Sequence, residues 1–126
     1  MLRDELVVCD VSNNRLQCFT LEGRYTRAIG RRGMAPGCFT LPTGVAATGG
    51  LLLVAEKWRI QVLTAEGVPL QVVTPPVCGS LQGLSCRGTR VLVADSEVRQ
   101  VHEFEVNPVK LRALGDGAPL RDEAPF

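Results

Sequence analysis

The chain contains a single histidine among its 126 residues, and this scarcity limits the chemistry that it can support. Histidine is the usual general base near neutral pH and a common metal ligand, and His102 alone cannot form a multi-histidine metal centre. No serine lies in the G-x-S-x-G context of an activated nucleophile. We therefore expect no catalytic residues, no bound metal or cofactor, and no enzymatic activity.

Paired cysteine motifs are also absent. The number of cysteines is odd, and no two of them form a C-x-x-C pair. Such a set fits small apolar packing residues in a reducing compartment better than a disulfide framework or a zinc site. A cytoplasmic location is expected. The cysteines concerned are Cys9, Cys18, Cys38, Cys78 and Cys86.

Long apolar runs and an excess of charge of one sign are missing as well. No apolar stretch reaches 18 residues, which argues against a signal peptide, a membrane span and a membrane partner. The chain has 14 basic and 13 acidic residues, so no overall field attracts it to nucleic acid. Any charged binding site must therefore be local.

The sequence does contain one motif in three copies. Each copy is an apolar strand that ends in an acid, followed by a turn and an Arg-led strand. The acids Asp10, Glu56 and Asp95 are 46 and 39 residues apart, a spacing typical of four-stranded propeller blades. Frequent glycine and proline disfavour helices of three turns between the copies. The sequence predicts an all-β repeat protein.

Each acid is matched by an arginine across a short turn. We predict one structural ion pair or turn cap in every repeat, because a repeated turn needs such a contact. A ring of metal-binding carboxylates is the alternative, and the matched arginines favour the structural interpretation. The predicted pairs are Asp10 with Arg15, Glu56 with Arg59, and Asp95 with Arg99.

The phrase GCFTLPTGVA at 37–46, joined to LVAE at 53–56 and RIQV at 59–62, resembles the NHL repeat. The resemblance is strongest over residues 30–73 and weaker elsewhere, because the third unit has LQGLS at 81–85 in place of the Leu-Pro-x-Gly-Val phrase. It implies a partial β-propeller of about three four-stranded antiparallel blades, each with strands a to d from axis to rim.

The predicted NHL-repeat segment covers residues 1–115, with blades at about 5–29, 43–73 and 83–114. The first blade lacks its innermost strand, and residues 116–126 form a C-terminal tail or the start of a linker to another blade. An open arc leaves apolar faces and strand edges uncovered. We expect self-association or the remainder of a longer gene product to close the ring. The predicted strands are 5–10, 15–20, 24–29, 43–47, 51–55, 59–64, 69–73, 83–86, 90–94, 98–105 and 109–114.

One loop face carries the candidate binding residues. In an antiparallel blade the b–c and d–a connections emerge on the same face, which brings a tryptophan, three basic residues and two asparagines onto one surface. If Trp58 is exposed, it offers a rigid flat contact beside directional donors; the alternative is that it folds back over the blade edge. The candidate residues are Asn13, Asn14, Arg31, Arg32, Lys57 and Trp58.

The resemblance implies a non-catalytic scaffold that binds a protein, as NHL segments do in ubiquitin ligases of the tripartite-motif class. RNA binding, which some tripartite-motif NHL propellers perform on a basic face, is the alternative, although Glu56, Asp95, Glu97 and Asp116 dilute the positive charge here. A third possibility is the remnant of a propeller hydrolase or lyase. The peptidylglycine lyases hold zinc through several histidines, and this chain has one.

Overall fold

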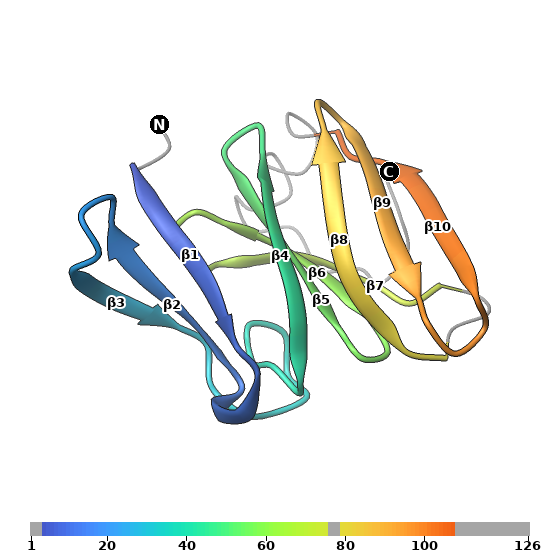
Figure 1. Ribbon diagram of the computed structural model, residues 1–126, viewed down its shortest axis with the longest axis horizontal. Helices are drawn as coiled ribbons and strands as arrows, with labels where there is room; N and C mark the ends of the chain where they lie inside the picture. The colour runs from blue at the N-terminus through green and yellow to red at the C-terminus, as the bar shows by residue number, and fades with distance from the viewer. Residues whose placement is uncertain (1–3, 76–78, 108–126) are drawn as a thin grey trace.

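The computed structural model describes residues 4–75 and 79–107, which form three antiparallel sheets standing side by side (Figure 1). The first sheet has the order β1 (Glu5–Asp10), β2 (Arg15–Thr20), β3 (Tyr25–Ile29), with the short 3-10 helix η1 (Val11–Asn13) between β1 and β2. The second has the order β4 (Pro42–Thr48), β5 (Leu51–Glu56), β6 (Ile60–Thr64), β7 (Pro69–Val73). The third contains β8 (Leu81–Arg87), β9 (Arg90–Asp95) and β10 (Gln100–Glu105), with β9 in the middle.

The register of the sheets assigns each strand its place in a repeated blade. The strands that end in the repeated acid, β1, β5 and β9, are the b strands, and β2, β6 and β10 pair with them as c strands. The a strands β4 and β8 pair with β5 and β9 on the other side. The strands β3 and β7 are d strands. Within the described residues, the first blade therefore has strands b, c and d only.

The core lies between neighbouring blades and explains the uninterrupted apolar run of β5. Leu51, Leu53 and Ala55 pack in a cluster shared with the third sheet, whereas Leu52 and Val54 pack in a cluster shared with the first. All six residues of β5 are buried. A strand sandwiched between two sheets needs apolar side chains at successive positions, and this is the pattern seen.

A glycine makes room for the linker between the first two blades. Phe39 is fully buried in the cluster between the first two sheets. A Cβ atom built on Gly30, which has φ of +81°, would lie 2.3 Å from a carbon of the Phe39 ring, much closer than van der Waals contact allows. Glycine is therefore required at this position both by its backbone conformation and by the close approach of the ring.

The all-β fold class and the partial propeller architecture are confirmed. Every predicted strand within the described residues is present, with ends that agree to within two residues. The strand predicted at 109–114 and the tail at 116–126 lie outside the described residues. Across residues 4–75 and 79–107, no helix has the length and hydropathy needed to cross a bilayer.

Candidate functional site

The acid at the end of β5 holds together the turn and the incoming linker of its blade. The Glu56 side chain is 2% exposed. Its carboxylate accepts hydrogen bonds from Arg59 Nε at 2.7 Å, from Gln61 Nε2 at 2.8 Å and from the backbone N–H of Thr40 at 2.8 Å. Thr40 lies two residues before β4, so one buried carboxylate ties strands b and c to the start of strand a.

In the first repeat, the acid again accepts from an arginine and a glutamine of the c strand, but its third donor is a side chain of the turn and not a backbone N–H. Asp10 accepts from Arg15 Nε at 3.1 Å, from Gln17 Nε2 at 2.7 Å and from Asn13 Nδ2 at 3.0 Å. Hydrogen bonds from Gln17, Asn13 and Arg15 hold the pKa of the Asp10 carboxyl below its usual value. The predicted ion pairs of Asp10 with Arg15 and of Glu56 with Arg59 are both present.

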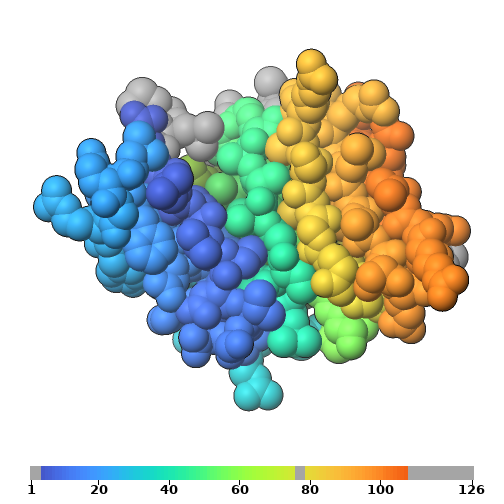
Figure 2. Space-filling model, viewed as in Figure 1, coloured from blue at the N-terminus to red at the C-terminus, as the bar shows by residue number. Residues whose placement is uncertain are grey.

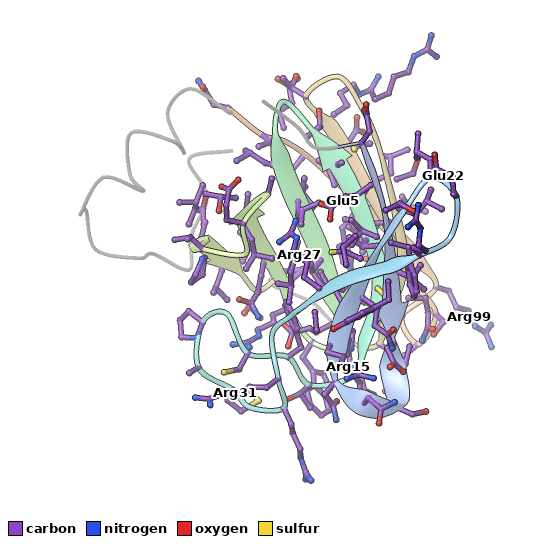
Figure 3. The ribbon with its side chains drawn as sticks, turned by 90° about the vertical axis from the view of Figure 1, so that its left-hand side faces the viewer. Glu5, Arg15, Glu22, Arg27, Arg31 and Arg99 are labelled. Carbon is purple, nitrogen blue, oxygen red and sulfur yellow. The ribbon has the colours of Figure 1, made fainter. Side chains whose placement is uncertain are left out.

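The third predicted pair, Asp95 with Arg99, is wrong, because Asp95 contacts His102 instead. His102 Nε2 lies 3.1 Å from the Asp95 carboxylate. Arg99 is exposed and has a left-handed backbone with φ of 58°, as Asn14 has with φ of 54° in the first repeat. Arg99 is therefore the counterpart of Asn14 at the end of the turn, and it points away from the sheets (Figure 3). The register places Gln100, opposite Asp95, where the first repeat has Arg15.

Asp95 is the most heavily hydrogen-bonded of the three acids. It accepts from the backbone N–H groups of Gly79 at 2.9 Å and Ser80 at 3.0 Å, which precede β8, and from the N–H of Val98. Burial alone raises the pKa of the Asp95 carboxyl, but hydrogen bonds from Ser80, Gly79, His102 and Val98 outweigh it and lower that pKa far below the usual value. All three acids are thus engaged in holding turns and linkers.

A further residue of each c strand, two positions beyond the arginine position, also contacts the acid and was not predicted from the sequence. These residues are Gln17, Gln61 and His102, and each contacts the acid of its repeat. The sequence does indicate this residue in the first two copies, because both contain Arg-x-Gln, at 15–17 and at 59–61. In the third copy the positions read Gln100 and His102, so the pattern is hidden.

The segments that carry the six candidate binding residues lie at one end of the molecule, the lower end in Figure 1. They are the β1–β2 turn, the linker from β3 to β4 and the β5–β6 turn. Asn14 Oδ1 accepts from the N–H of Leu41 at 2.9 Å, which joins the first turn to the linker. Arg59 Nη1 donates to the carbonyl of Met34 at 2.7 Å, which joins the linker to the second turn.

The asparagines and the arginines among the six candidates differ in how far they are engaged within the chain. Asn13 and Asn14 are engaged internally, with Asp10 and with the Leu41 N–H respectively. Arg31 and Arg32 are exposed, and Arg31 is placed by a hydrogen bond from the Phe39 N–H to its carbonyl. Figure 3 shows Arg31 in the linker that follows β3.

Trp58 is 46% exposed, so its ring does not fold back over the blade edge. Lys57 Nζ lies 5.2 Å from the centroid of the Trp58 ring, within cation–π range. The half-buried Lys57 therefore serves as a support for the ring on the surface.

Exposed apolar side chains surround these residues, and sequence reasoning did not single them out. Val11 is 39% exposed, Leu41 39% and Met34 62%. The hydrogen bonds of Asn14 with Leu41 and of Arg59 with Met34 tie the linker that carries Met34 and Leu41 to the two turns. We call this set the loop-end surface; it consists of Val11, Arg31, Arg32, Met34, Leu41 and Trp58.

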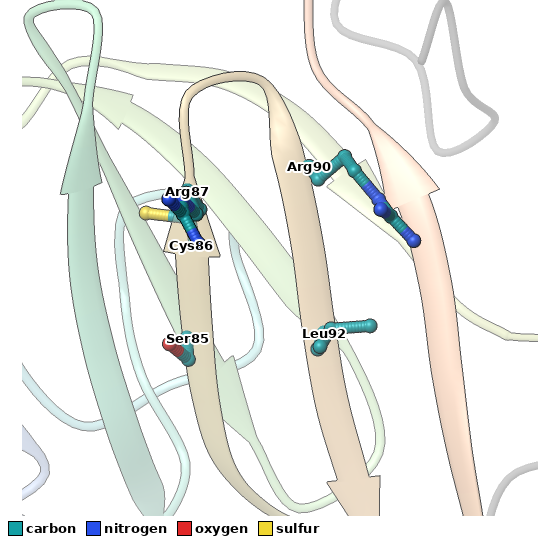
Figure 4. A pocket seen from close by; sticks show the side chains of 5 residues that line it. All are labelled: Ser85, Cys86, Arg87, Arg90 and Leu92. Atoms are coloured by element: carbon teal, nitrogen blue, oxygen red, sulfur yellow. The ribbon is translucent and has the colours of Figure 1, made fainter.

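A separate pocket of about 200 Å³ opens on the third sheet (Figure 4). Cys86 is among its lining residues, and its thiol donates to the Ala47 carbonyl at 3.2 Å. Burial raises the pKa of the Cys86 thiol, and raises that of Cys9 to about 11, which disfavours the reactive thiolate. The lining contains no carboxylate or imidazole to act as a base, being made of Ser85, Cys86, Arg87, Arg90 and Leu92.

No cluster of three or more potential metal-ligating side chains occurs within residues 4–75 and 79–107. The geometry of the described residues consists of hydrogen-bonded turns beside a group of exposed side chains at the loop end.

Comparison with known proteins gives a likeness of fold only. No family model matches the sequence, and no curated protein matches it. Among solved structures, the chain is similar to the β-propeller domain of Cps50 (Swd1) from Myceliophteria thermophila, with 12% identity and a TM-score of 0.40. The match covers 91% of this chain and 43% of that domain, so the chain spans less than half the length of the structure that it matches.

Proposed function

We propose that the chain is a non-catalytic interaction module of the NHL type and that it binds a protein partner through the loop-end surface. The observation that carries the proposal is the combination of an exposed tryptophan, two exposed arginines and three exposed apolar side chains at one end of the sheets. Tryptophan and arginine are the residue types most enriched among binding hot spots. The loop phrase at 37–46 supports the NHL assignment.

The composition of this surface favours a protein over RNA. Single-stranded RNA is held by stacked aromatic rings and many phosphate contacts, whereas this surface has one aromatic ring and two exposed arginines beside Val11, Met34 and Leu41. Aliphatic side chains gain free energy when a protein surface covers them. The nearly balanced charge of the chain points the same way.

The test is a quantitative pulldown with the full chain and the triple variant Arg31→Ala, Arg32→Ala, Trp58→Ala. Proteins captured by the native chain should fall at least tenfold with this variant, because removal of hot-spot residues typically costs 2 kcal/mol or more. The matched control Leu21→Ala, Arg24→Ala, Val68→Ala removes exposed residues at the opposite end and should leave capture unchanged. Unchanged capture by the first variant, or loss of capture after nuclease treatment, would contradict the proposal.

We also propose that further blades cover the two outer faces, supplied by the remainder of a longer gene product or by a second copy. Leu6 and Val8 occupy the register positions that Leu52 and Val54 hold in β5, yet both are 48% exposed. Light scattering of the isolated chain should give a mass above 13.6 kDa because these faces associate. A monodisperse monomer would contradict the proposal, whether the covering blades come from a longer gene product or from a second copy.

A further inference from the structure

The strand β1 has one edge without a ladder partner among the described residues. Its counterparts β5 and β9 each lie between two strands, with β4 and β8 on the side toward the axis. In contrast, β1 pairs only with β2 within the described chain. In Figure 1, β1 stands at the front of the first sheet, as β4 does in the second. Unpaired strand edges present a row of N–H and C=O groups that can bind another strand.

In the part of the chain that the structure describes, the carboxylate at the end of β1 has no backbone donor from a linker, unlike its two counterparts. Glu56 accepts from the N–H of Thr40, and Asp95 accepts from the N–H groups of Gly79 and Ser80. These donors immediately precede β4 and β8, the strands that occupy the edge. Within residues 4–75 and 79–107, Asp10 accepts hydrogen bonds only from side chains of its own hairpin.

The exposure of the three carboxylates follows the same division. The Asp10 side chain is 21% exposed, compared with 2% for Glu56 and 0% for Asp95. The amide of Asn13 donates to both oxygens of Asp10, at 3.1 and 3.0 Å, so a side chain of the turn occupies the acceptor that a backbone N–H uses in the other repeats. Asp10 is therefore only partly exposed at the point where the other repeats place the amide of an incoming strand.

From the free edge and the partly exposed carboxylate together, we propose that β1 and Asp10 form a docking site for an extended strand of a partner protein. The strand pairs antiparallel with β1, and a backbone N–H just before it donates to Asp10 in place of the exposed Asn13 amide. The two complete repeats supply the template for this arrangement, which is independent of the loop-end surface.

The template also fixes the register and the chemistry of the docked strand. In the second blade Val45 lies opposite Val54, and Ala47 lies opposite Leu52. The equivalent partners on β1 are Val8 and Leu6, whose side chains are half exposed. The docked strand should therefore carry apolar residues opposite Val8 and Leu6, with a non-proline residue at the position that donates to Asp10.

The chain itself offers a probe, namely its own segment 39–48 as an acetylated, fluorescent peptide added to the full chain. Fluorescence anisotropy should show saturable binding, and amide hydrogen exchange should slow within β1. Methylation of the Thr40 nitrogen removes the donor to the carboxylate and should weaken binding about tenfold, as expected for a hydrogen bond to a charged group. The peptide modification leaves the protein unchanged, so it cannot impair folding.

Protein variants supply the matched comparison. Asp10→Asn should weaken peptide binding about tenfold, whereas Glu22→Gln, which removes an exposed charge from the β2–β3 turn, should have no effect. Absence of binding, slowed exchange outside β1, or equal binding of the methylated peptide would overturn the proposal. If β1 amides are already protected in the free chain and lose protection on dilution, a second copy is the occupant and the assignment to a partner protein is overturned.

Discussion

His102 Nε2 lies 3.1 Å from the Asp95 carboxylate, at the position in β10 where β6 carries Gln61. Both side chains donate to the acid of their repeat, so an imidazole has replaced an amide without loss of the contact. The only histidine of the chain is thereby part of the repeat framework.

The replacement His102→Gln should be tolerated. Glutamine at this position restores the contact seen in the other two repeats, whereas His102→Ala leaves the buried Asp95 with its backbone donors alone. We expect the urea midpoint of His102→Gln to match that of the native chain and that of His102→Ala to be lower. A lower midpoint for His102→Gln than for His102→Ala would contradict the assigned equivalence.

Acid should destabilise the fold through Asp95. The folded pKa of this carboxyl lies far below its unfolded value of about 3.9, so its contribution is complete above pH 5 and is lost as pH falls through 4 toward the folded pKa. The urea midpoint should therefore drop between pH 5 and pH 2. In the Asp95→Asn variant the urea midpoint should fall less over this pH range than in the native protein. An equal fall in both proteins would contradict this role of Asp95.

A leucine at equivalent positions of β5 and β9 should contribute differently to the free energy of unfolding. Leu53 in β5 is fully buried, and Leu92 holds the equivalent register position in β9 with 43% exposure. Leu53→Ala should cost about 3 kcal/mol of unfolding free energy, because it removes core contacts and leaves a cavity. Leu92→Ala should cost about 0.5 kcal/mol. Chemical denaturation of the two variants compares them directly, and similar losses would mean that the outer face of β9 is covered.

Alanine substitutions at two glycines should distinguish the cost of backbone strain from the cost of a steric clash. Gly23 and Gly30 both have positive φ, but a Cβ at Gly23 meets no atom within 4 Å, whereas at Gly30 it meets the Phe39 ring. Gly23→Ala should cost about 1 kcal/mol through backbone strain alone. Gly30→Ala should cost at least 2 kcal/mol more, because Phe39 must leave its place in the core. Equal thermal denaturation midpoints for the two variants would contradict the packing of Phe39.

Much of the fold could be predicted because it depends on local pattern. The apolar run 51–55 and the alternation at 59–63 mark strands b and c directly, and glycine and proline mark the turns. The error at Arg99 arose from turn geometry: the second turn, from Glu56 to Arg59, is two residues shorter than the first and third. Matching acids to the next arginine therefore ignored the left-handed residue that ends the longer turns.

The candidate surface was only partly predictable. Connectivity alone places the b–c turns and d–a linkers at one end, as the structure has them. It cannot tell which polar side chains are engaged internally, and Asn13 and Asn14 are. Nor does it identify Met34 and Leu41 as exposed, because their exposure depends on how Phe39 and Arg59 anchor the linker.

Hydroxyl-radical footprinting of the chain with its captured partner tests the loop-end surface most directly. Methionine and aromatic side chains oxidise readily when exposed, and the chain has such reporters at both ends. Met34 and Trp58 are 62% and 46% exposed at the loop end, and Tyr25 is 57% exposed beside the β2–β3 turn. The proposed function predicts that the partner slows oxidation of Met34 and Trp58 and leaves Tyr25 unchanged. Protection of Tyr25 with unchanged oxidation of Met34 and Trp58 would contradict it.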